Sequence, residues 1–166
     1  MKILIVSDTH RKNENLKKVL DREPPFDMMI HLGDAEGSEV IYRKWLPVQT
    51  RLIVLKGNND FFTDAPYERI IELDGCRIFM THGHRYSLHS GYMALRNEAA
   101  RRGASIAVYG HSHEPVAEYC KGVLMLNPGS TSWPRQENRK PSYIVLTLEG
   151  GKPVSYEIRY LDLDEL

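Results

Sequence analysis

Cysteine is scarce in this sequence, which contains only Cys76 and Cys120. The two residues are far apart and form no CxxC pair, so a framework of disulfide bonds is not expected. Two reduced thiols suit a cytoplasmic protein, and we expect both side chains simply to pack against their neighbours. Neither cysteine is assigned a catalytic role.

Long apolar runs are lacking as well, since no stretch approaches the roughly 18 residues that a membrane-spanning helix needs. Met1 and Lys2 lead directly into a strand-like run rather than into a signal peptide, so we expect a soluble protein with no membrane partner. Charge of one sign is not in excess, because 22 basic residues balance 22 acidic ones. Without a broad basic surface, extended nucleic acid is not an expected partner.

The chain shows no internal repeat, no low-complexity segment and no linker. Its 166 residues are enough for one domain with a well-buried core and too few for two full domains. We therefore predict a single domain over residues 1–166. The oligomeric state is left open, a homo-oligomer included.

Apolar runs alternate with helical patterns in the first half of the chain, which predicts βαβ units and a mainly parallel sheet. Strands are expected at residues 3–6, 28–32 and 52–55. One helix is expected after a cap at Asn13 or Asn15, and a second should run from residue 38 to about residue 45, before Pro47.

The second half of the chain is richer in strand patterns. A hairpin is predicted around Asp74 and Gly75, between residues 70–73 and 76–80. Ser90 is placed to cap a helix that Gly103 ends. Further strands are expected at residues 106–109, 123–126 and 143–148, and at the alternating apolar positions of residues 154–160. Together these elements predict an α/β protein in which two mixed sheets pack face to face with helices outside, a four-layer αββα sandwich.

Seven residues of types that bind metal ions follow the predicted strands in a fixed order. They are Asp8, His10, Asp34, Asn58, His82, His111 and His113. Because each stands in a loop just after a short apolar run, a sheet could aim all seven at one point. Two divalent ions held there can generate hydroxide from water near neutral pH and stabilise both the attacking and the leaving oxygen of a phosphoryl group. The order therefore predicts a two-metal phosphoesterase.

Each of these motifs is weak evidence by itself. Asp8 and His10 point to the same side of an extended strand and can share an ion, although an aspartate at a strand end also forms ordinary turns. Asp34 follows Gly33 and can bridge two cations through its two oxygens. Asn58 offers an amide oxygen in what is otherwise an Asn-rich turn, and a lone histidine is usually structural. The joint occurrence is the stronger signal.

The ordered set resembles the calcineurin-like metallophosphoesterase family, and most closely its small single-domain phosphodiesterases of bacteria and archaea. The resemblance runs from Asp8 to about Ser132 and includes the Asn-Pro-Gly-Ser segment at residues 127–130. It implies the αββα fold and two divalent transition-metal ions per chain. By this resemblance one ion is held by Asp8, His10, Asp34 and His113, and the other by Asp34, Asn58, His82 and His111. Manganese is the expected metal for activity, with Ni²⁺, Zn²⁺ or Fe as alternatives.

The sequence departs from many members of that family at Asn59, where they carry a histidine that stabilises the transition state or protonates the leaving oxygen. An amide has no titratable proton near neutral pH, so Asn59 can donate a hydrogen bond to a phosphoryl oxygen but cannot be a general acid. Asp60 is expected to orient its neighbours rather than to bind metal. His84 is a candidate for contacting the phosphate, because it follows a ligand by two residues. His31 and His89 are expected to be structural or solvated.

Formal charge favours a phosphodiester substrate. Two divalent ions carry +4, Asp8 and Asp34 contribute −2, and a bridging hydroxide leaves about +1, which a diester monoanion neutralises. A monoester dianion needs additional cations, for which Arg11, Lys12 and Arg135 are candidates. We therefore expect a phosphodiesterase in which a bridging hydroxide attacks a small phosphate ester, with a phosphomonoesterase as the alternative. A non-catalytic metal-binding scaffold, which resembles the retromer subunit of the same fold, should have lost ligands, and all seven are present here.

Overall fold

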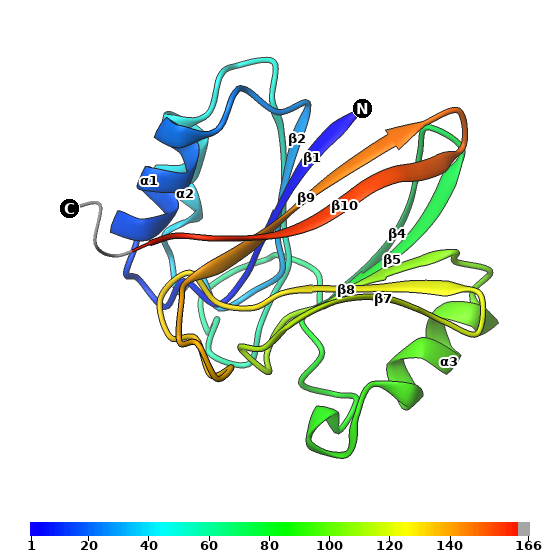
Figure 1. Ribbon diagram of the computed structural model, residues 1–166. Helices are drawn as coiled ribbons and strands as arrows, with labels where there is room; N and C mark the ends of the chain where they lie inside the picture. Colours follow the sequence, from blue (N-terminus) through cyan, green and yellow to red (C-terminus); the bar gives the residue numbers. More distant parts are fainter. Residues whose placement is uncertain (163–166) are drawn as a thin grey trace.

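The protein folds into two five-stranded sheets in the computed structural model, which describes residues 1–162 (Figure 1). The first sheet has the order β10-β9-β1-β2-β3 and consists of β1 (Lys2–Val6), β2 (Met28–His31), β3 (Arg51–Val54), β9 (Ser142–Glu149) and β10 (Lys152–Tyr160). The second has the order β4-β5-β6-β8-β7 and consists of β4 (Glu68–Leu73), β5 (Cys76–Thr81), β6 (Ile106–Val108), β7 (Pro115–Cys120) and β8 (Val123–Pro128). The helices are α1 (Glu14–Arg22), α2 (Glu39–Trp45) and α3 (Met93–Arg101). A 3₁₀ turn at Leu88–Ser90 precedes α3. No helix within residues 1–162 is long and apolar enough to cross a membrane.

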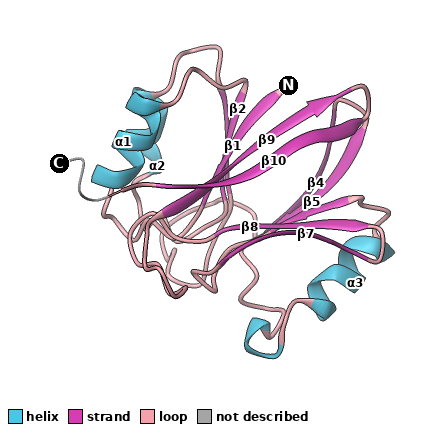
Figure 2. Cartoon of the chain, in the orientation of Figure 1, coloured by secondary structure: helices cyan, strands magenta, loops and turns pink. Residues whose placement is uncertain are grey.

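The strand β1 is apolar and buried from Ile3 to Val6 because both faces of its sheet are covered. Ile3 and Ile5 belong to the core between the two sheets, whereas Leu4 and Val6 pack on the other face, toward α1 and α2. The second sheet is covered on its outer face by α3, which contributes Leu95. Helices therefore lie outside both sheets (Figure 2), and the predicted four-layer αββα sandwich is confirmed.

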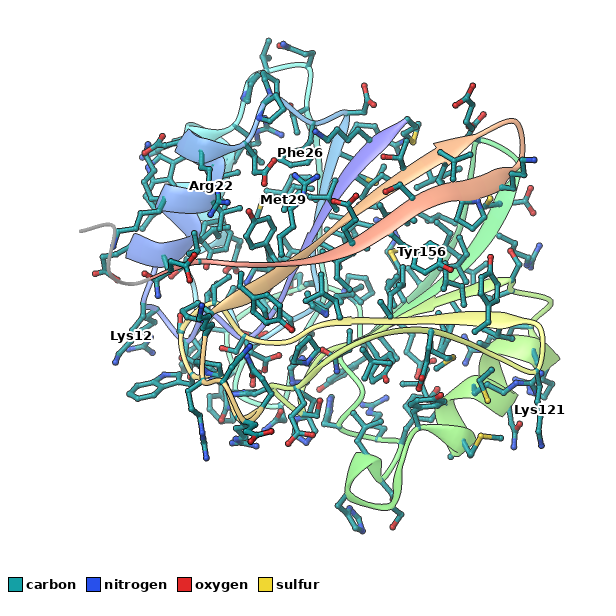
Figure 3. The ribbon with its side chains drawn as sticks, viewed as in Figure 1. Lys12, Arg22, Phe26, Met29, Lys121 and Tyr156 are labelled. Atoms are coloured by element: carbon teal, nitrogen blue, oxygen red, sulfur yellow. The ribbon has the colours of Figure 1, made fainter. Side chains whose placement is uncertain are left out.

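The layer between the first sheet and its helices shows how the sequence stabilises this packing. Phe26 and Met29 lie in this layer together with Tyr42, and Tyr156 of β10 packs against the central core (Figure 3). Met29 is fully buried. Burial of a side chain of this size stabilises the fold by about 1.5–3 kcal/mol relative to exposure.

The arrangement of parallel strands determines where the site forms. β1, β2 and β3 are parallel neighbours in the first sheet, and β5, β6 and β8 are parallel neighbours in the second. Parallel strands present their carboxyl ends at the same edge of a sheet, where ligands of open α/β sheets usually bind. The loops that follow β1, β2, β3, β5 and β6 can therefore converge.

Three details differ from the sequence predictions. β7 was not predicted, because it begins with a proline and is partly exposed, so it shows neither a buried run nor a strict alternation. Ser90 as the cap of the third helix was wrong, since Ser90 closes the 3₁₀ turn and α3 begins after Tyr92. In β10 a bulge between Pro153 and Ser155 leaves Val154 48% exposed, which interrupts the predicted alternation.

Candidate metal centre

Five loops at one edge of the sandwich bring the predicted ligands together. Asp8 and His10 follow β1, Asp34 follows β2, Asn58 follows β3, His82 follows β5, and His111 and His113 follow β6. Backbone hydrogen bonds tie neighbouring loops directly. The N–H of His10 donates to the carbonyl of Asp34 across 2.9 Å, and the N–H of Gly110 donates to that of His82 across 2.9 Å. The loops are therefore held in a fixed relation.

Most of the predicted ligands have an unusual backbone conformation. The φ angles are 55° at Asp8, 47° at His10, 59° at Asp34, 68° at His111 and 60° at His113. Left-handed conformations are uncommon outside glycine and persist where the surrounding structure enforces them. Because such strain gathers at functional sites, it marks this edge of the sandwich as a candidate site.

Glycines occupy two positions where neighbouring loops approach too closely for a residue with a side chain. A Cβ atom on Gly57 would lie 2.1 Å from Asp34 Oδ1, and one on Gly110 would lie 2.1 Å from Ser7 Oγ. Only glycine allows so close an approach of backbone to a side chain. The two glycines therefore let the carboxylates of Asp34 and Asp8 sit against neighbouring backbone.

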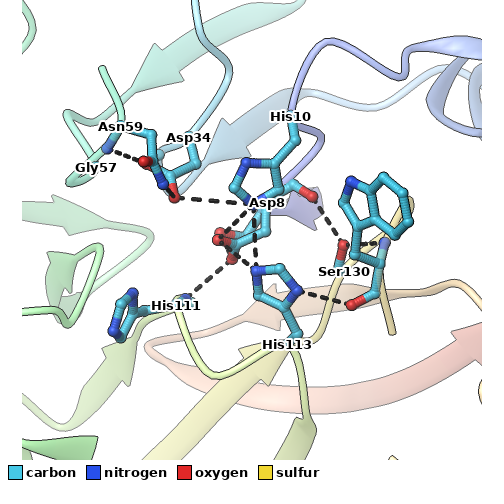
Figure 4. Close-up of polar contacts among 12 residues, drawn as sticks. Asp8, His10, Asp34, Gly57, Asn59, His111, His113 and Ser130 are labelled. Atoms are coloured by element: carbon cyan, nitrogen blue, oxygen red, sulfur yellow. Dashed lines mark hydrogen bonds and ion pairs between the residues drawn. The ribbon is translucent and has the colours of Figure 1, made fainter. Parts of the chain in front are cut away.

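Asp8, His10 and His113 form one group of potential ligands (Figure 4). His113 Nε2 lies 3.2 Å from Asp8 Oδ1 and 3.2 Å from His10 Nε2. His10 Nε2 lies 3.7 Å from Asp8 Oδ1 and 3.8 Å from Asp34 Oδ2. One ion can reach these atoms together, because metal bonds to imidazole nitrogen and carboxylate oxygen are about 2.0–2.2 Å long.

Asp8, Asp34 and His82 form a second group. His82 Nε2 lies 3.4 Å from Asp34 Oδ2, 3.7 Å from Asp8 Oδ1 and 3.1 Å from Asn58 Oδ1. His111 joins this side, since the centroid of its ring lies 5.2 Å from that of His82. Asp34 Oδ2 is near histidines of both groups, which is the position that a bridging carboxylate needs.

One carboxylate oxygen in the centre lacks a hydrogen-bond partner. Asp8 Oδ2 accepts hydrogen bonds from the Ser7 hydroxyl across 2.6 Å and from the His111 backbone N–H across 2.9 Å. Asp8 Oδ1 is buried and accepts none from the described residues, although it faces the Nε2 atoms of the neighbouring imidazoles. A buried carboxylate oxygen is costly unless it is satisfied. A divalent cation fits this position and this set of donors.

The buried carboxylates stay ionised beside the histidines. Burial alone would raise the pKa of Asp8, but the neighbouring histidines, His82 foremost, hold it well below its ordinary value. Burial also opposes ionisation of Asp34, whereas His82 and Asn59 lower its pKa to about 2. Burial in turn favours a neutral His82, but Asp8 and Asp34 raise its pKa to about 9. The negative field that holds a proton on His82 favours a divalent cation in the same place.

Acceptors outside the centre orient the imidazoles. His82 Nδ1 donates to the carbonyl of Leu32 across 2.8 Å, and His113 Nδ1 donates to the carbonyl of Trp133 across 2.7 Å. His10 Nδ1 lies 3.6 Å from a glutamate carboxylate. Because the carbonyls can only accept, the Nδ1 atoms of His82 and His113 carry hydrogen and their Nε2 atoms face the centre, as metal ligands require.

Asp60 and Asn59 hold Asp34 in place. Asp60 Oδ2 accepts the backbone N–H groups of Asp34 and Gly57, and its Oδ1 accepts that of Glu36, each across 2.7 Å. Asn59 donates its backbone N–H to Asp34 Oδ1 and its side-chain amide to Asp34 Oδ2, both across 2.9 Å. Asp60 thus connects the loops that follow β2 and β3, and Asn59 contacts the carboxylate of Asp34, which was predicted to bridge the two metal ions.

The His84 ring lies beside two predicted ligands. Its centroid is 5.5 Å from that of His82, 6.2 Å from that of His111 and 5.8 Å from that of Tyr67. Its Nδ1 atom is buried and has no hydrogen-bond partner among the described residues. Burial, followed by the charge of His82, lowers the pKa of His84. The lowered pKa favours the neutral form of the ring.

Comparison with known proteins identifies the family. Residues 1–151 match the sequence profile of the calcineurin-like phosphoesterase superfamily domain. The chain belongs to this family. Among its phosphoesterase relatives, the probable metallophosphoesterase YsnB of Bacillus subtilis is 38% identical over 150 residues, which cover 90% of this chain and 85% of YsnB. The phosphodiesterase MJ0936 of Methanocaldococcus jannaschii is 32% identical over 145 residues, which cover 78% of this chain and 83% of MJ0936.

The calcineurin-like fold also occurs in more distant proteins. Vps29 of Entamoeba histolytica, solved in complex with Zn²⁺, matches with a TM-score of 0.77 at 18% identity, over 98% of this chain and 99% of that one. At this identity the likeness concerns the fold alone. The predicted family is thus confirmed by the sequence match, and its relatives support a hydrolase in general with a divalent-metal site.

Sequence reasoning missed two parts of this phosphoesterase centre. Ser130, the last residue of the Asn-Pro-Gly-Ser segment, donates its hydroxyl to the carbonyl of Asp8 across 2.7 Å. His31 is fully buried, and its Nε2 lies 3.0 Å from the hydroxyl of Thr9, which lies 2.7 Å from that of Tyr42. The four-residue motif was a signal for the first contact. The second joins residues that share no sequence pattern.

Two grooves border the metal centre of this calcineurin-like protein. The first has a volume of about 440 Å³ and is lined by His10, His113, Trp133, Pro134, Arg135 and Arg139. The second has a volume of about 510 Å³, and its lining includes His84, His89, His111 and Arg135. Both volumes lie within the range of about 300–1,000 Å³ that is common for small-ligand sites. Arg135 lines both grooves and so stands where they meet.

Proposed function

We propose that the protein is a phosphodiesterase that uses two divalent transition-metal ions to hydrolyse small phosphodiesters. The observation that carries this proposal is Asp8 Oδ1, a buried oxygen that faces imidazole Nε2 atoms and accepts no hydrogen bond from the described residues. One ion would be held by Asp8, His10, Asp34 and His113, and the other by Asp34, Asn58, His82 and His111. This mixture of nitrogen and oxygen donors accepts Mn²⁺, which we expect to support activity best, as well as Ni²⁺, Zn²⁺ or Fe.

The chain's own residues hold the donor atoms in place before a substrate arrives. Asp60 fixes the loop of Asp34 through short hydrogen bonds, and the carbonyls of Leu32 and Trp133 fix two imidazoles. Such preorganisation reduces the rearrangement that accompanies the reaction. When bound, the two ions would supply a nucleophile from water near neutral pH and offset negative charge on the phosphoryl oxygens.

Two side chains have hydrogen-bonding capacity to spare for a phosphoryl oxygen. The Asn59 amide donates one of its two hydrogens to Asp34 Oδ2, and the other remains. The His84 ring lines the second groove beside His111, and a neutral imidazole carries one N–H that can donate a hydrogen bond. An amide cannot protonate a leaving oxygen, so the site should favour esters whose leaving group departs as a stable anion.

The two grooves favour a phosphodiester over a phosphomonoester. A diester carries two ester arms, and each groove is lined by a predicted ligand, His113 in one and His111 in the other. A phosphoryl group at the centre could thus extend one arm into each groove. A monoester has one arm and would leave the other groove unused.

A non-catalytic metal-binding scaffold is the alternative from another class, and the fold likeness to Vps29 is the observation in its favour. It would bind metal without turning over a phosphate ester. The enzyme is the better supported reading, because all seven ligand positions are filled and the chain is 32% identical to a protein named a phosphodiesterase.

The environment of the cysteines supports a cytoplasmic location for this activity. Cys76 and Cys120 are both free thiols, and Cys76 is buried. Free thiols of this kind are typical of a reducing compartment. Fractionation of cells with an antibody against the protein would test the location.

The test of the function is hydrolysis by protein that has been stripped with a chelator and reloaded with Mn²⁺. Bis(4-nitrophenyl) phosphate, a cyclic nucleotide and 4-nitrophenyl phosphate compare an aryl diester, an alkyl diester and a monoester. We expect the aryl diester to be hydrolysed fastest and the stripped protein to be inactive. Faster hydrolysis of the monoester would instead support a phosphomonoesterase. Metal binding without hydrolysis of any of the three would support the scaffold.

A further inference from the structure

Trp133 presents a large aromatic side chain beside the metal centre. The residue is 50% exposed, which is a high fraction for an indole, and it lines the first groove together with the predicted ligands His10 and His113. Aromatic side chains supply a large contact area while losing few rotatable bonds on binding. An exposed indole at this place is therefore available to a bound substrate.

The backbone of Trp133 is fixed to the centre at two points. Its N–H donates to Ser130 Oγ across 2.8 Å, and its carbonyl accepts a hydrogen bond from His113 Nδ1 across 2.7 Å. The Ser130 hydroxyl in turn donates to the carbonyl of Asp8 across 2.7 Å. The backbone that carries the indole is thus held in a defined position relative to two predicted ligands. Less freedom is lost on binding when a contact surface is already in place.

The groove around the indole is cationic. Lys12 Nζ lies 3.5 Å from the centroid of a Trp133 ring, and Arg135 and Arg139 line the same groove. No described acidic residue lines it. Guanidinium groups bind phosphate oxygens, and an aromatic face accepts the flat side of a ring. This combination suits an anionic ester with a planar aromatic substituent.

We propose that Trp133 stacks on an aromatic ring in one arm of the substrate, so that the substrates are phosphodiesters carrying an aryl group or a nucleobase. The inference rests on the proposed function, which places the phosphoryl group at the metal centre. In this arrangement the ligands hold the phosphoryl group and Trp133 selects the arm. The measured strength of stacked aromatic pairs corresponds to a gain in affinity of about 2- to 12-fold.

The test is calorimetric binding of two non-hydrolysable ligands to the Mn²⁺-loaded protein. Phenylphosphonate and methylphosphonate share a head group and differ in the aromatic ring. We expect the unmodified protein to bind phenylphosphonate about 2- to 12-fold more tightly. Trp133→Ala should abolish this preference, and Trp133→Phe should retain most of it. Both substitutions keep the backbone N–H and carbonyl that contact Ser130 and His113, so the metal content should be unchanged.

A matched control is Tyr119→Ala, which removes an aromatic side chain of similar exposure, 55%, from the edge strand β7. It should keep the preference for the phenyl ligand. Equal binding of the two phosphonates by the unmodified protein, or a preference that survives in Trp133→Ala, would overturn the inference. A nucleoside phosphonate in the same assay tells which ring is recognised, since Trp133→Ala weakens its binding only if nucleobases stack there.

Hydrolysis of bis(4-nitrophenyl) phosphate in the same preparation separates this inference from the proposed function. Hydrolysis without a Trp133-dependent preference overturns the aromatic site and leaves the phosphodiesterase. A Trp133-dependent preference without hydrolysis supports the aromatic site and overturns the phosphodiesterase.

Discussion

Replacement of Asp60 by asparagine should destabilise the protein even though Asp60 is not a predicted metal ligand. Asp60 is 6% exposed, and its carboxylate accepts three backbone N–H groups, those of Asp34, Gly57 and Glu36, each across 2.7 Å. An asparagine offers one acceptor oxygen in place of two and turns an NH₂ group toward at least one of these donors. A buried donor left without an acceptor costs about 1–3 kcal/mol, so Asp60→Asn should lower the free energy of unfolding by about that amount.

Urea unfolding of the metal-free protein measures this effect. The control is Asp64→Asn, which makes the same change at an exposed position of the same loop and should stay within about 0.5 kcal/mol of the unmodified protein. Because the carboxylate holds the backbone of Asp34, Asp60→Asn should also weaken Mn²⁺ binding, whereas Asp64→Asn should not. If both variants unfolded at the same urea concentration, the three hydrogen bonds would not have the role assigned to them.

Three further predictions concern the centre itself. Asp34→Asn and His111→Ala should lose nearly all hydrolysis of bis(4-nitrophenyl) phosphate while keeping the fold by circular dichroism, and Tyr119→Ala, at a position that lines neither groove, should match the unmodified protein; substantial turnover by Asp34→Asn at saturating metal would rule out a bridging role. Rates over diesters of graded leaving-group acidity should depend steeply on leaving-group pKa, because Asn59 cannot provide the acid catalysis that is commonly worth about 10²–10⁴; alkyl esters cleaved as fast as aryl ones would refute this. Because the folded protein raises the pKa of His82 from 6.5 to about 9, protonation of His82 stabilises the metal-free protein fully below pH 6.5, and this stabilisation is lost as the pH rises through about 9. The urea concentration at the unfolding midpoint should therefore decrease as the pH is raised from 6.5 to 9.5, and it should decrease less in His82→Gln.

The convergence of the candidate ligands could be predicted from the sequence, because each of them stands just after an apolar run that predicts a strand. Asp8, Asp34 and His82 each follow an apolar run that becomes a parallel strand, and parallel strands bring their carboxyl ends to one edge. Glycines next to the motifs were a second signal. Gly57 and Gly110 are needed because the loops approach within the reach of a Cβ atom.

Other features depend on contacts between distant parts of the chain and left no local signal. The strand β7 pairs with one neighbour and is partly exposed, so its side chains show no clear period. Asn59 donates its backbone N–H and one side-chain amide hydrogen to Asp34, which lies 25 residues away in the sequence. The place of Trp133 in the groove follows from the path of a loop, which composition and spacing do not specify.

The central claim is that two metal ions share one centre, and the most direct test is the metal content of active protein. The protein is stripped with a chelator, titrated with Mn²⁺ and assayed with bis(4-nitrophenyl) phosphate, while bound metal is counted by elemental analysis. Seven ligands with Asp34 between the two groups predict a stoichiometry close to two per chain, with activity that rises as the second ion binds. Full activity at a maximum of one ion per chain would contradict the two-metal centre.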